Sequence, residues 1–293
     1  MIKTILITGA STGFGRDTAE TLARAGHNVF ASMRDPKAKN RLHADALLVQ
    51  DIEVVELDVT DTQSVDRAVA AVIAKAGRID VLINNAGVLA AGVSEAFTPE
   101  QATSLFDVNV IGLLRVTRAV LPDLRRHNDG LIINVGSILG RVTFPFFGIY
   151  GASKFAVEAL TDSLRHEVSQ LGIDVALVQP SAYPTQLFAS ATRPVDLGRV
   201  AEYGSVGEIP DAMFQQFDSM LSAPGAPDPH DIAEAIAKLI VTPKGDRPAR
   251  TVVGASYGAD TLNDATEPVQ ASVLQALGLS YLATVTSALK KSA

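Results

Sequence analysis

The sequence predicts an α/β fold in which helices cover both faces of a doubly wound, seven-stranded parallel sheet. Short β-branched runs alternate with longer helical patterns along most of the 293 residues, as in repeated βα units. Several of these runs lack polar alternation, which is expected of strands covered on both sides. We expect strands at residues 4–8, 28–32, 53–57, 81–84, 131–135, 174–178 and 251–254.

The stretches between these strands carry helix start signals. Thr98-Pro99-Glu100 and Asp228-Pro229 place a proline just inside a helix start, where its missing N–H costs little. The expected helices span residues 15–25, 64–76, 99–126, 148–171 and 229–240.

One segment, from about residue 185 to 228, breaks the alternation. It is too long for an ordinary loop, and its apolar residues recur at roughly helical spacing. These residues are Met213, Phe214, Phe217, Met220 and Leu221. We interpret the segment as a partly helical flap over a site. No repeat or convincing boundary divides the chain, so we expect residues 1–293 to form a single domain.

The composition narrows the class of protein. A hydrophobic content of 47% with 19% charged residues argues against disorder. The net charge of −7 and the pI near 5.2 fit a cytoplasmic protein and favour neither a nucleic-acid nor an anionic-membrane partner. With no cysteine, disulfides and thiolate metal sites are excluded. We expect neither a signal peptide nor a membrane span, because the apolar runs are short.

A glycine-rich turn directly follows the first expected strand and precedes an alanine-rich helix. Glycines let the backbone turn tightly and let a phosphate approach the N–H groups, while the helix N-terminus adds positive potential. The turn therefore predicts a pyrophosphate site, unless its glycines only shape a loop. The residues expected to hold the phosphates are Gly9, Ser11, Thr12, Gly13, Phe14 and Gly15.

The spacing of this turn, Thr-Gly-x-x-x-Gly-x-Gly, resembles that of the short-chain dehydrogenase/reductase family. Five further segments agree with the family in order and spacing, and the matching motifs extend from Thr8 to Thr185. The resemblance implies a Rossmann-type fold, a nicotinamide cofactor, and hydride transfer to or from the carbonyl or alcohol carbon of a small-molecule substrate.

The end of the second strand favours NADP(H) over NAD(H), which stays possible. Met33 stands where NAD-preferring relatives usually carry aspartate, and Arg34 follows it. A guanidinium can pair with the 2′-phosphate of NADP, whereas a carboxylate suits the ribose hydroxyls of NAD. The alternative is a solvated Arg34 with Asp35 turned inward.

Two more segments fall at strand ends, where ligands bind in open parallel sheets. The resemblance assigns Asp58 and Val59 to the adenine side of the cofactor, and implies that Asn85, Ala86 and Gly87 stabilise the central sheet and line the cofactor. Either segment, taken alone, could be only a turn between a strand and a helix.

The segment after the sixth strand matches the family's Pro-Gly-x-x-x-Thr pattern incompletely. Pro180 and Thr185 match, and the resemblance places them beside the nicotinamide end of the cofactor. Ser181 replaces the usual glycine, so we expect the backbone here to differ from that of relatives.

Tyr150 and Lys154 are four residues apart in an expected helix and so lie on one face of it. A cation about 4 to 6 Å from a phenol lowers the pKa of the phenol from its usual value near 10. Lys154 supplies one positive charge and an oxidised nicotinamide ring would supply another, so we expect a lowered pKa for Tyr150 and an effective proton exchanger. The alternative is an exposed helix in which Lys154 has no partner.

Ser137 and Asn109 complete the site that the resemblance implies. Ser137, at the end of the fifth strand, could donate to a substrate oxygen as charge develops there, or it could be a turn serine. Asn109 lies inside a long expected helix, although asparagine is an indifferent helix former. In the family the matching asparagine distorts its helix and holds a water next to the lysine. The implied catalytic tetrad is Asn109, Ser137, Tyr150 and Lys154.

Large apolar residues before Tyr150 and at the start of the flap, most of them aromatic, indicate a bulky hydrophobic substrate. These are Phe144, Phe146, Phe147, Leu187 and Phe188, which could equally fill the core or a subunit contact. The length and the C-terminal extension are similar to those of the retinal reductase and 17β-hydroxysteroid dehydrogenase branch.

Other functions fit the sequence less well. A non-catalytic NADP-binding sensor or scaffold commonly loses the tyrosine or the lysine, and an epimerase or dehydratase fits the short C-terminal region poorly. The five histidines show no metal-ligand spacing, so we expect no metal. We expect a homodimer or homotetramer formed through helices 99–126 and 148–171.

Overall fold

The sheet has seven parallel strands, as the sequence predicts. In the computed structural model, which describes residues 1–286, the strand order is β3-β2-β1-β4-β5-β6-β7. Because the order reverses beside β1, helices leave β1 and β4 toward opposite faces and a crevice opens between their carboxyl ends. The strands are β1 Thr4–Ile7, β2 Asn28–Met33, β3 Glu53–Glu56, β4 Val81–Asn84, β5 Gly130–Val135, β6 Ile173–Pro180 and β7 Arg250–Val253.

Helices cover both faces of this sheet. The α-helices are α1 Gly13–Arg24, α2 Arg41–Leu48, α3 Thr62–Ala76, α4 Pro99–Phe106, α5 Leu113–His127, α6 Gly148–Ser169, α7 Gln186–Ala189, α8 Leu197–Glu202, α9 Ser205–Leu221, α10 His230–Val241 and α11 Ala259–Ala276. Shorter turns of other helix types are η1 Ser94–Ala96, η2 Asp107–Gly112, η3 Ile138–Gly140 and η4 Ser280–Ala283.

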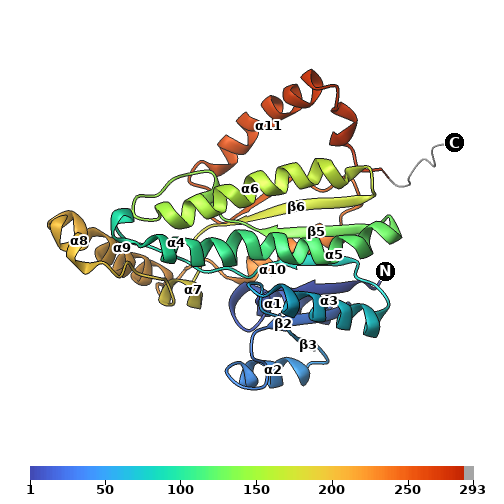
Figure 1. Cartoon of the computed structure of the whole chain (residues 1–293), viewed down its shortest axis with the longest axis horizontal. Coiled ribbons are helices and arrows are strands. Elements are labelled where there is room, and N and C mark those ends of the chain that lie inside the picture. Colours follow the sequence, from blue (N-terminus) through green and yellow to red (C-terminus); the bar gives the residue numbers. More distant parts are fainter. Residues whose placement is uncertain (287–293) are drawn as a thin grey trace.

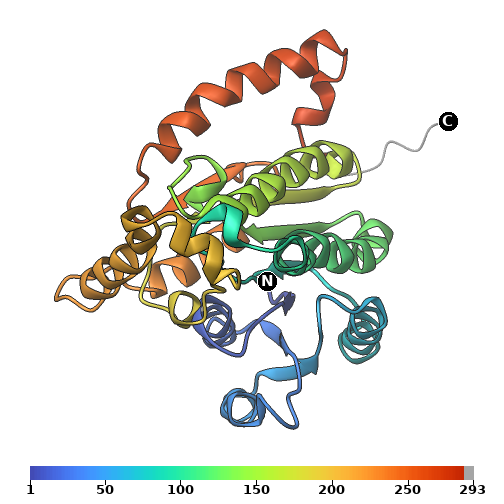
Figure 2. The ribbon, with the colours of Figure 1, turned by 60° about the vertical axis from the view of Figure 1, so that its left-hand side comes forward.

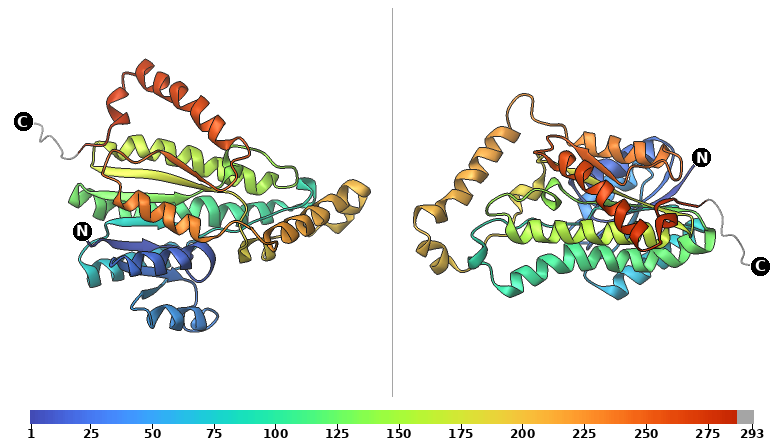
Figure 3. Two further views of the ribbon diagram at one scale, coloured as in Figure 1. Left: turned by 180° about the vertical axis from the view of Figure 1, so that it is seen from behind. Right: turned by 90° about the horizontal axis from the view of Figure 1, so that it is seen from above.

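Two hydrophobic cores fill the spaces between sheet and helices. Helices α3, α5 and α6 lie in front of the sheet in Figure 1, where Val69 and Val120 join one core. Helix α10 lies on the back, with Leu22 of α1 and Ile236 in the other core (Figure 3). Both sides of the central strands are therefore buried, which explains their apolar character.

The helix expected at residues 99–126 is divided into three parts. Thr98 and Gln101 form a capping box at its start, with Pro99 in the first turn as expected. The chain then widens into the π-helical segment η2 before α5 begins. The local distortion that the resemblance implies at Asn109 is found as this π-helical segment, which places one extra residue in a turn. Pro229, expected inside a helix, is instead the N-cap of α10.

The flap region is helical and projects from the sheet at the carboxyl ends of the strands (Figures 1 and 2). Its longest helix, α9, carries the five apolar residues singled out by their spacing. Helix α9 contains Pro210 near its start, within the first turns.

Helices α2 and α11 were not predicted. Helix α11 stands away from α6 (Figures 1 and 3), and its side chains are mostly exposed. Leu274 is buried, and Asn263 donates to Gln179 at 2.7 Å. The apolar pattern of α11 is weak because few of its residues face a core. Residues 287–293 of the expected domain lie outside the described residues. Within residues 1–286, no helix is both long and apolar enough to cross a bilayer.

Candidate active site

The glycine-rich turn leads from the carboxyl end of β1 into α1. Gly9 and Gly13 have φ values of +68° and +57°, which residues with a side chain rarely adopt. A Cβ at Gly15 would lie 2.4 Å from Nδ2 of Asn85, so this position also requires glycine. Thr12, the N-cap of α1, makes no side-chain cap hydrogen bond. The N–H groups of the first helical turn are therefore free to bind an anion.

Thr8 and Asn85 fasten this turn to the end of β4. Asn85 Nδ2 donates to the carbonyls of Thr8 at 2.9 Å and Gly9 at 3.1 Å. The Thr8 hydroxyl accepts from the N–H groups of Asn85 and Ala86, both at 3.0 Å. A Cβ at Gly9 would lie 2.8 Å from Cα of Ala86, so the two segments are in close contact. The structure thus brings together the predicted segments at residues 9–15 and 85–87.

Arg34 follows β2 and is exposed, and within residues 1–286 its side chain makes no ion pair. Its carbonyl accepts from Nδ2 of Asn40 at 2.6 Å, which holds the loop. Asp35 is also exposed, and its side chain makes no ion pair within residues 1–286. Met33 is buried and offers no carboxylate. Both the guanidinium of Arg34 and the carboxylate of Asp35 are therefore accessible after β2, while the position at the strand end carries no charge.

Asp58 and Val59 lie at the end of β3. Oδ1 of Asp58 accepts from the N–H and the hydroxyl of Thr60, at 2.9 and 2.7 Å. Its second carboxylate oxygen has no hydrogen-bond partner in the described part of the chain. The carbonyl of Val59 accepts from Arg115, and Gly112 allows close packing because a Cβ there would lie 2.9 Å from Val59.

Tyr150, Lys154 and Ser137 lie together at the start of α6 and the end of β5. Tyr150 and Lys154 are buried, with 6% and 7% of their surface exposed. Nζ of Lys154 lies 5.7 Å from the centre of the Tyr150 ring and donates to the carbonyl of Val135 at 3.0 Å. The Ser137 side chain hydrogen-bonds with Tyr150. Gly87 brings the β4 segment to this group, since a Cβ there would lie 3.9 Å from Nζ.

Burial shifts the pKa values of both Tyr150 and Lys154. It raises the pKa of Tyr150 to about 12, while the hydrogen bond with Ser137 acts in the opposite direction. The lowered pKa expected for Tyr150 is therefore wrong for the protein's own side chains, because the hydration that the phenolate loses on burial outweighs the hydrogen bond with Ser137. Burial lowers the pKa of Lys154 to about 8, and the charge of Glu158 raises it. Tyr150 is thus a neutral phenol beside a lysine that titrates near neutral pH.

Asn109 lies in η2 and is buried, with 2% of its surface exposed. Its side-chain oxygen accepts a hydrogen bond from the N–H of Val88, and its Nδ2 donates to the carbonyl of Val88. Nδ2 also donates to the hydroxyl of Ser153 at 3.1 Å. That hydroxyl donates to the carbonyl of Tyr150 at 2.7 Å. Sequence reasoning missed Ser153, although a small polar residue on the inward side between Tyr150 and Lys154 was a signal.

Tyr183 lies between Pro180, the last residue of β6, and Thr185, the N-cap of α7. It is 1% exposed, and its hydroxyl donates to Oδ2 of Asp231 at 3.3 Å. Its ring packs edge-to-face with the Phe14 ring of the phosphate turn, with 5.6 Å between the ring centres. This residue, to which the sequence assigned no role, joins the segment after β6 to α1 and α10.

A cavity of about 340 Å³ lies beside the phosphate turn and is bordered by an ion pair that sequence reasoning missed. Nδ1 of His230 lies 2.9 Å from Oδ2 of Asp17, which joins α10 to α1. The hydrogen bond with Asp17 raises the pKa of His230. The residues that line the cavity are Thr12, Gly13, Asp17, Pro184, Thr185, Gln186, Asp228, Pro229 and His230.

An apolar cluster extends from Tyr150 to the flap. Its buried members besides Tyr150 are Leu89, Ala90, Ala91, Leu105 and Phe147. The flap contributes Leu187, Phe188, Met213, Phe214 and Phe217. The rings of Phe147 and Phe214 are stacked, with 6.1 Å between their centres. Phe144 joins the cluster as expected, but Phe146 does not. Met220 of α9 is exposed instead.

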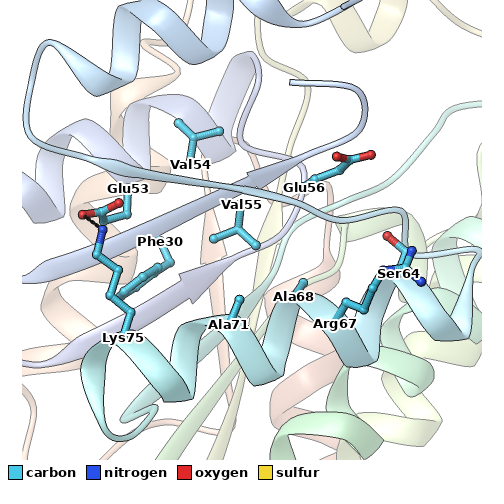
Figure 4. A pocket seen from close by; sticks show the side chains of 10 residues that line it. All are labelled: Phe30, Glu53, Val54, Val55, Glu56, Ser64, Arg67, Ala68, Ala71 and Lys75. Carbon is cyan, nitrogen blue, oxygen red and sulfur yellow. Dashed lines mark hydrogen bonds and ion pairs between the residues drawn. The ribbon is translucent and has the colours of Figure 1, made fainter. Parts of the chain in front are cut away.

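A separate surface groove of about 450 Å³ lies between β3 and α3 (Figure 4). It is lined by Phe30, Val55 and Ala68 at its centre, with Glu53 paired to Lys75 at its rim. None of the predicted catalytic or cofactor residues borders it. Among residues 1–286, no group of three or more His, Asp and Glu side chains is arranged to hold a metal ion.

Comparison with known proteins agrees with this arrangement. The family model for short chain dehydrogenases matches residues 3–196. A 3-ketodihydrosphingosine reductase of Bacteroides thetaiotaomicron is 41% identical over 62% of this chain and 64% of its own length. Retinol dehydrogenase 8 of Bos taurus is 34% identical over 81% of the chain and 78% of its own length. The human 17-beta-hydroxysteroid dehydrogenase type 1 is 37% identical over 60% of this chain and 55% of its own length.

Solved structures agree as well. A short-chain dehydrogenase from Streptomyces avermitilis is 33% identical, covers 96% of this chain and 98% of its own, and has a TM-score of 0.75. An actinorhodin polyketide ketoreductase solved with NADPH is 26% identical and has a TM-score of 0.71. The match covers 88% of this chain and 97% of the ketoreductase chain. The chain belongs to the short-chain dehydrogenase/reductase family of oxidoreductases, near the branch that contains retinol and 17β-hydroxysteroid dehydrogenases.

Proposed function

We propose that this oxidoreductase transfers hydride between NADP(H) and the carbonyl or alcohol carbon of a bulky hydrophobic ketone, aldehyde or alcohol. The observation that carries the proposal is the grouping of Tyr150, Lys154 and Ser137 at the carboxyl edge of the sheet. There Nζ of Lys154 is 5.7 Å from the Tyr150 ring, and Ser137 bonds to the phenol. A proton donor, a cation and a hydroxyl thus meet in one buried place beside the crevice.

The crevice fits a dinucleotide phosphate. The free N–H groups at the start of α1 suit a pyrophosphate, and the side chains of Ser11 and Thr12 make no hydrogen bonds within the described residues. Arg34 suits a 2′-phosphate, and the second carboxylate oxygen of Asp58 suits an adenine amino group. Asn85, Ala86 and Gly87 would face the middle of the cofactor, and Pro180 and Thr185 its nicotinamide end. Bound NADPH would supply the hydride.

Side chains of the protein would carry out the proton transfer that accompanies hydride transfer. During reduction, Tyr150 donates its phenolic proton to the carbonyl oxygen, while Ser137 hydrogen-bonds to that oxygen and orients it. Lys154 favours the resulting phenolate through its positive charge, and its pKa near 8 lets it exchange a proton near neutral pH. Asn109 holds the neighbouring β4 segment in place through Val88.

The apolar cluster supports the substrate class. Phe147 and the flap residues Phe188, Phe214 and Phe217 place an aromatic surface next to Tyr150. Such a surface suits a large ring or chain and excludes water from the reacting carbon. In this proposal residues 185–228 cover the substrate within a single domain. The relatives named for retinol and a hydroxysteroid are consistent with this class.

We also propose that two or four copies associate through α5 and α6. Three large apolar side chains on η2, α5 and α6 are partly exposed to solvent: Ile111 at 44%, Leu114 at 46% and Phe155 at 43%. Burial of these side chains against a second copy would stabilise an oligomer.

The test is turnover by a Tyr150→Phe variant. NADPH oxidation is followed with a panel of aryl, retinoid and steroid ketones and aldehydes, and with small ketones for comparison. The wild type should reduce at least one bulky compound, and Tyr150→Phe should lower kcat by about 10²- to 10⁴-fold while NADPH still binds. Tyr281→Phe, at an exposed position, is the matched control. An active Tyr150→Phe enzyme would disprove the assigned role of the phenol.

A further inference from the structure

Arg193 borders the apolar cluster that contains Tyr150. Its guanidinium carbon lies 3.8 Å from the centre of the Phe214 ring, and Nη1 donates to the carbonyl of Ala91 at 3.3 Å. Phe214 stacks on Phe147, which belongs to the same buried cluster as Tyr150. Packed aromatic side chains therefore connect the cluster that contains the proposed proton donor to a cation.

The ion pair of Arg193 is easily exchanged. Nη2 lies 3.1 Å from Oδ1 of Asp211, and the Asp211 side chain is 78% exposed. Such a pair is weak because water competes for the exposed carboxylate. The guanidinium itself is held by Phe214 and Ala91, so it stays in place when Asp211 moves away.

Other cations near the cluster are more firmly engaged. Arg199 pairs with Glu95 at 2.8 Å and Asp196 at 2.9 Å. Arg141 pairs with the buried Glu158 at 3.2 Å. Arg193 is therefore the arginine at this border whose partner a ligand can replace most readily.

We propose that the substrate carries a carboxylate that replaces Asp211 on Arg193, in addition to its apolar body and its carbonyl. A guanidinium presents N–H groups in a planar fork that matches a carboxylate, and an aromatic ring beneath it leaves the edge free for this bond. The substrate class is then an oxo acid with a long apolar body, bound with its carbonyl at Tyr150 and its acid at Arg193. This inference rests on the proposed function.

The test compares acids with their esters. The probes are benzoylpropionate, benzoylbutyrate and benzoylvalerate, each with its methyl ester, which keeps the ketone but removes the charge. For at least one chain length the wild type should show a kcat/KM about tenfold or more higher for the acid, as expected of a charged hydrogen bond. The chain length with the largest ratio reports the span from Tyr150 to Arg193.

Two variants should change this ratio in opposite directions. Arg193→Gln should bring the acid to the level of the ester, whereas Asp211→Asn, which removes the competing carboxylate, should increase the preference for the acid. Arg199→Gln removes a neighbouring exposed cation and should leave the ratio unchanged. Arg193→Lys keeps the charge without the fork and should retain part of the preference, which separates a loss of charge from a loss of folding.

The outcomes distinguish this inference from the proposed function. Equal use of acids and esters by the wild type, with NADPH oxidised, would overturn the inference alone. An Arg193→Gln variant that slows acid and ester equally would also overturn it, because Arg193 would then only hold the flap. No oxidation of NADPH with any compound of either panel would overturn the proposed function and the inference with it.

Discussion

Asn109 makes two hydrogen bonds to the backbone of Val88. Its Oδ1 accepts from the Val88 N–H at 2.8 Å, and its Nδ2 donates to the Val88 carbonyl at 2.9 Å. Val88 directly follows Gly87, so these bonds fix the segment that leaves β4 next to Lys154. The π-helical turn of η2 provides the geometry, because an extra residue in one turn redirects the side chains within it.

Asn109→Ala should destabilise the protein. Both backbone groups of Val88, which are partly buried, would lose their partner, and an unpaired polar group shielded from water costs about 1 to 3 kcal/mol. Urea unfolding of Asn109→Ala measures this loss, with Asn28→Ala, at an exposed position, as the control. An unchanged free energy of unfolding would mean that the two bonds do not hold the β4 segment. Asn109→Asp should also be destabilised, because a carboxylate cannot donate to the Val88 carbonyl.

The reduction rate should fall as the pH rises through about 8. The pKa of Lys154 is lowered to about 8 by burial, so its cation is present below that pH and lost above it. The pKa of Tyr150, raised to about 12, keeps the phenol protonated throughout this range. The measurement is kcat/KM for carbonyl reduction between about pH 6 and pH 10, where we expect a single falling limb with a slope near −1.

A flat profile across pH 8 would contradict this assignment. Lys154→Met should have low activity and no falling limb, since the group that titrates is missing. A limb that persists in Lys154→Met belongs to another group.

Cofactor choice should depend on Arg34. Arg34→Ala removes the guanidinium proposed to pair with the 2′-phosphate, a charged hydrogen bond of about 1.5 to 3 kcal/mol. We expect the ratio of kcat/KM for NADPH to that for NADH to fall about 10- to 100-fold, mainly through the KM for NADPH. Arg24→Ala, at the opposite end of α1, is the control. An unchanged ratio would show that the 2′-phosphate is recognised elsewhere.

The pair of His230 and Asp17 should make stability depend on pH. The pKa of His230 is raised above its usual 6.5, mainly by the hydrogen bond with Asp17, and Glu234 and Asp228 act in the same direction. A raised pKa in the folded state gives stability that is complete below about 6.5 and lost as the pH rises through the folded-state pKa. His230→Gln should therefore lower Tm more at about pH 5.5 than at about pH 8.5.

His43→Gln is the control for this measurement, since His43 makes no ion pair within residues 1–286. Asp17→Asn should reproduce the pH dependence of His230→Gln, because it removes the other half of the pair. A Tm difference that is the same at both pH values would mean that His230 does not titrate against Asp17.

Several features of the site could be predicted because they depend on short-range chemistry. Gly9 and Gly13 adopt positive φ values that only glycine adopts readily, so the turn is visible in the sequence. Tyr150 and Lys154 share one helical face because of their spacing. The parallel strands could be recognised as well, because burial on both faces leaves apolar runs without alternation.

Other features depend on residues far apart in the chain. Helix α11 was missed because its exposed surface leaves little apolar periodicity. The pKa of Tyr150 was expected to be lowered by its neighbour in the helix, but burial formed by the whole fold raises it. Ser153, Tyr183 and His230 acquired their partners only when separate elements packed together.

The sequence alone determined the sheet and the phosphate turn, since backbone conformation and hydrophobic patterning act over a few residues. The proposed reacting side chains follow from the family resemblance of their motifs. Tertiary structure decided the protonation of Tyr150 and Lys154, the two bonds from Asn109 to Val88, and the position of Arg193 over Phe214. These depend on desolvation and on contacts between distant segments, which no local pattern contains.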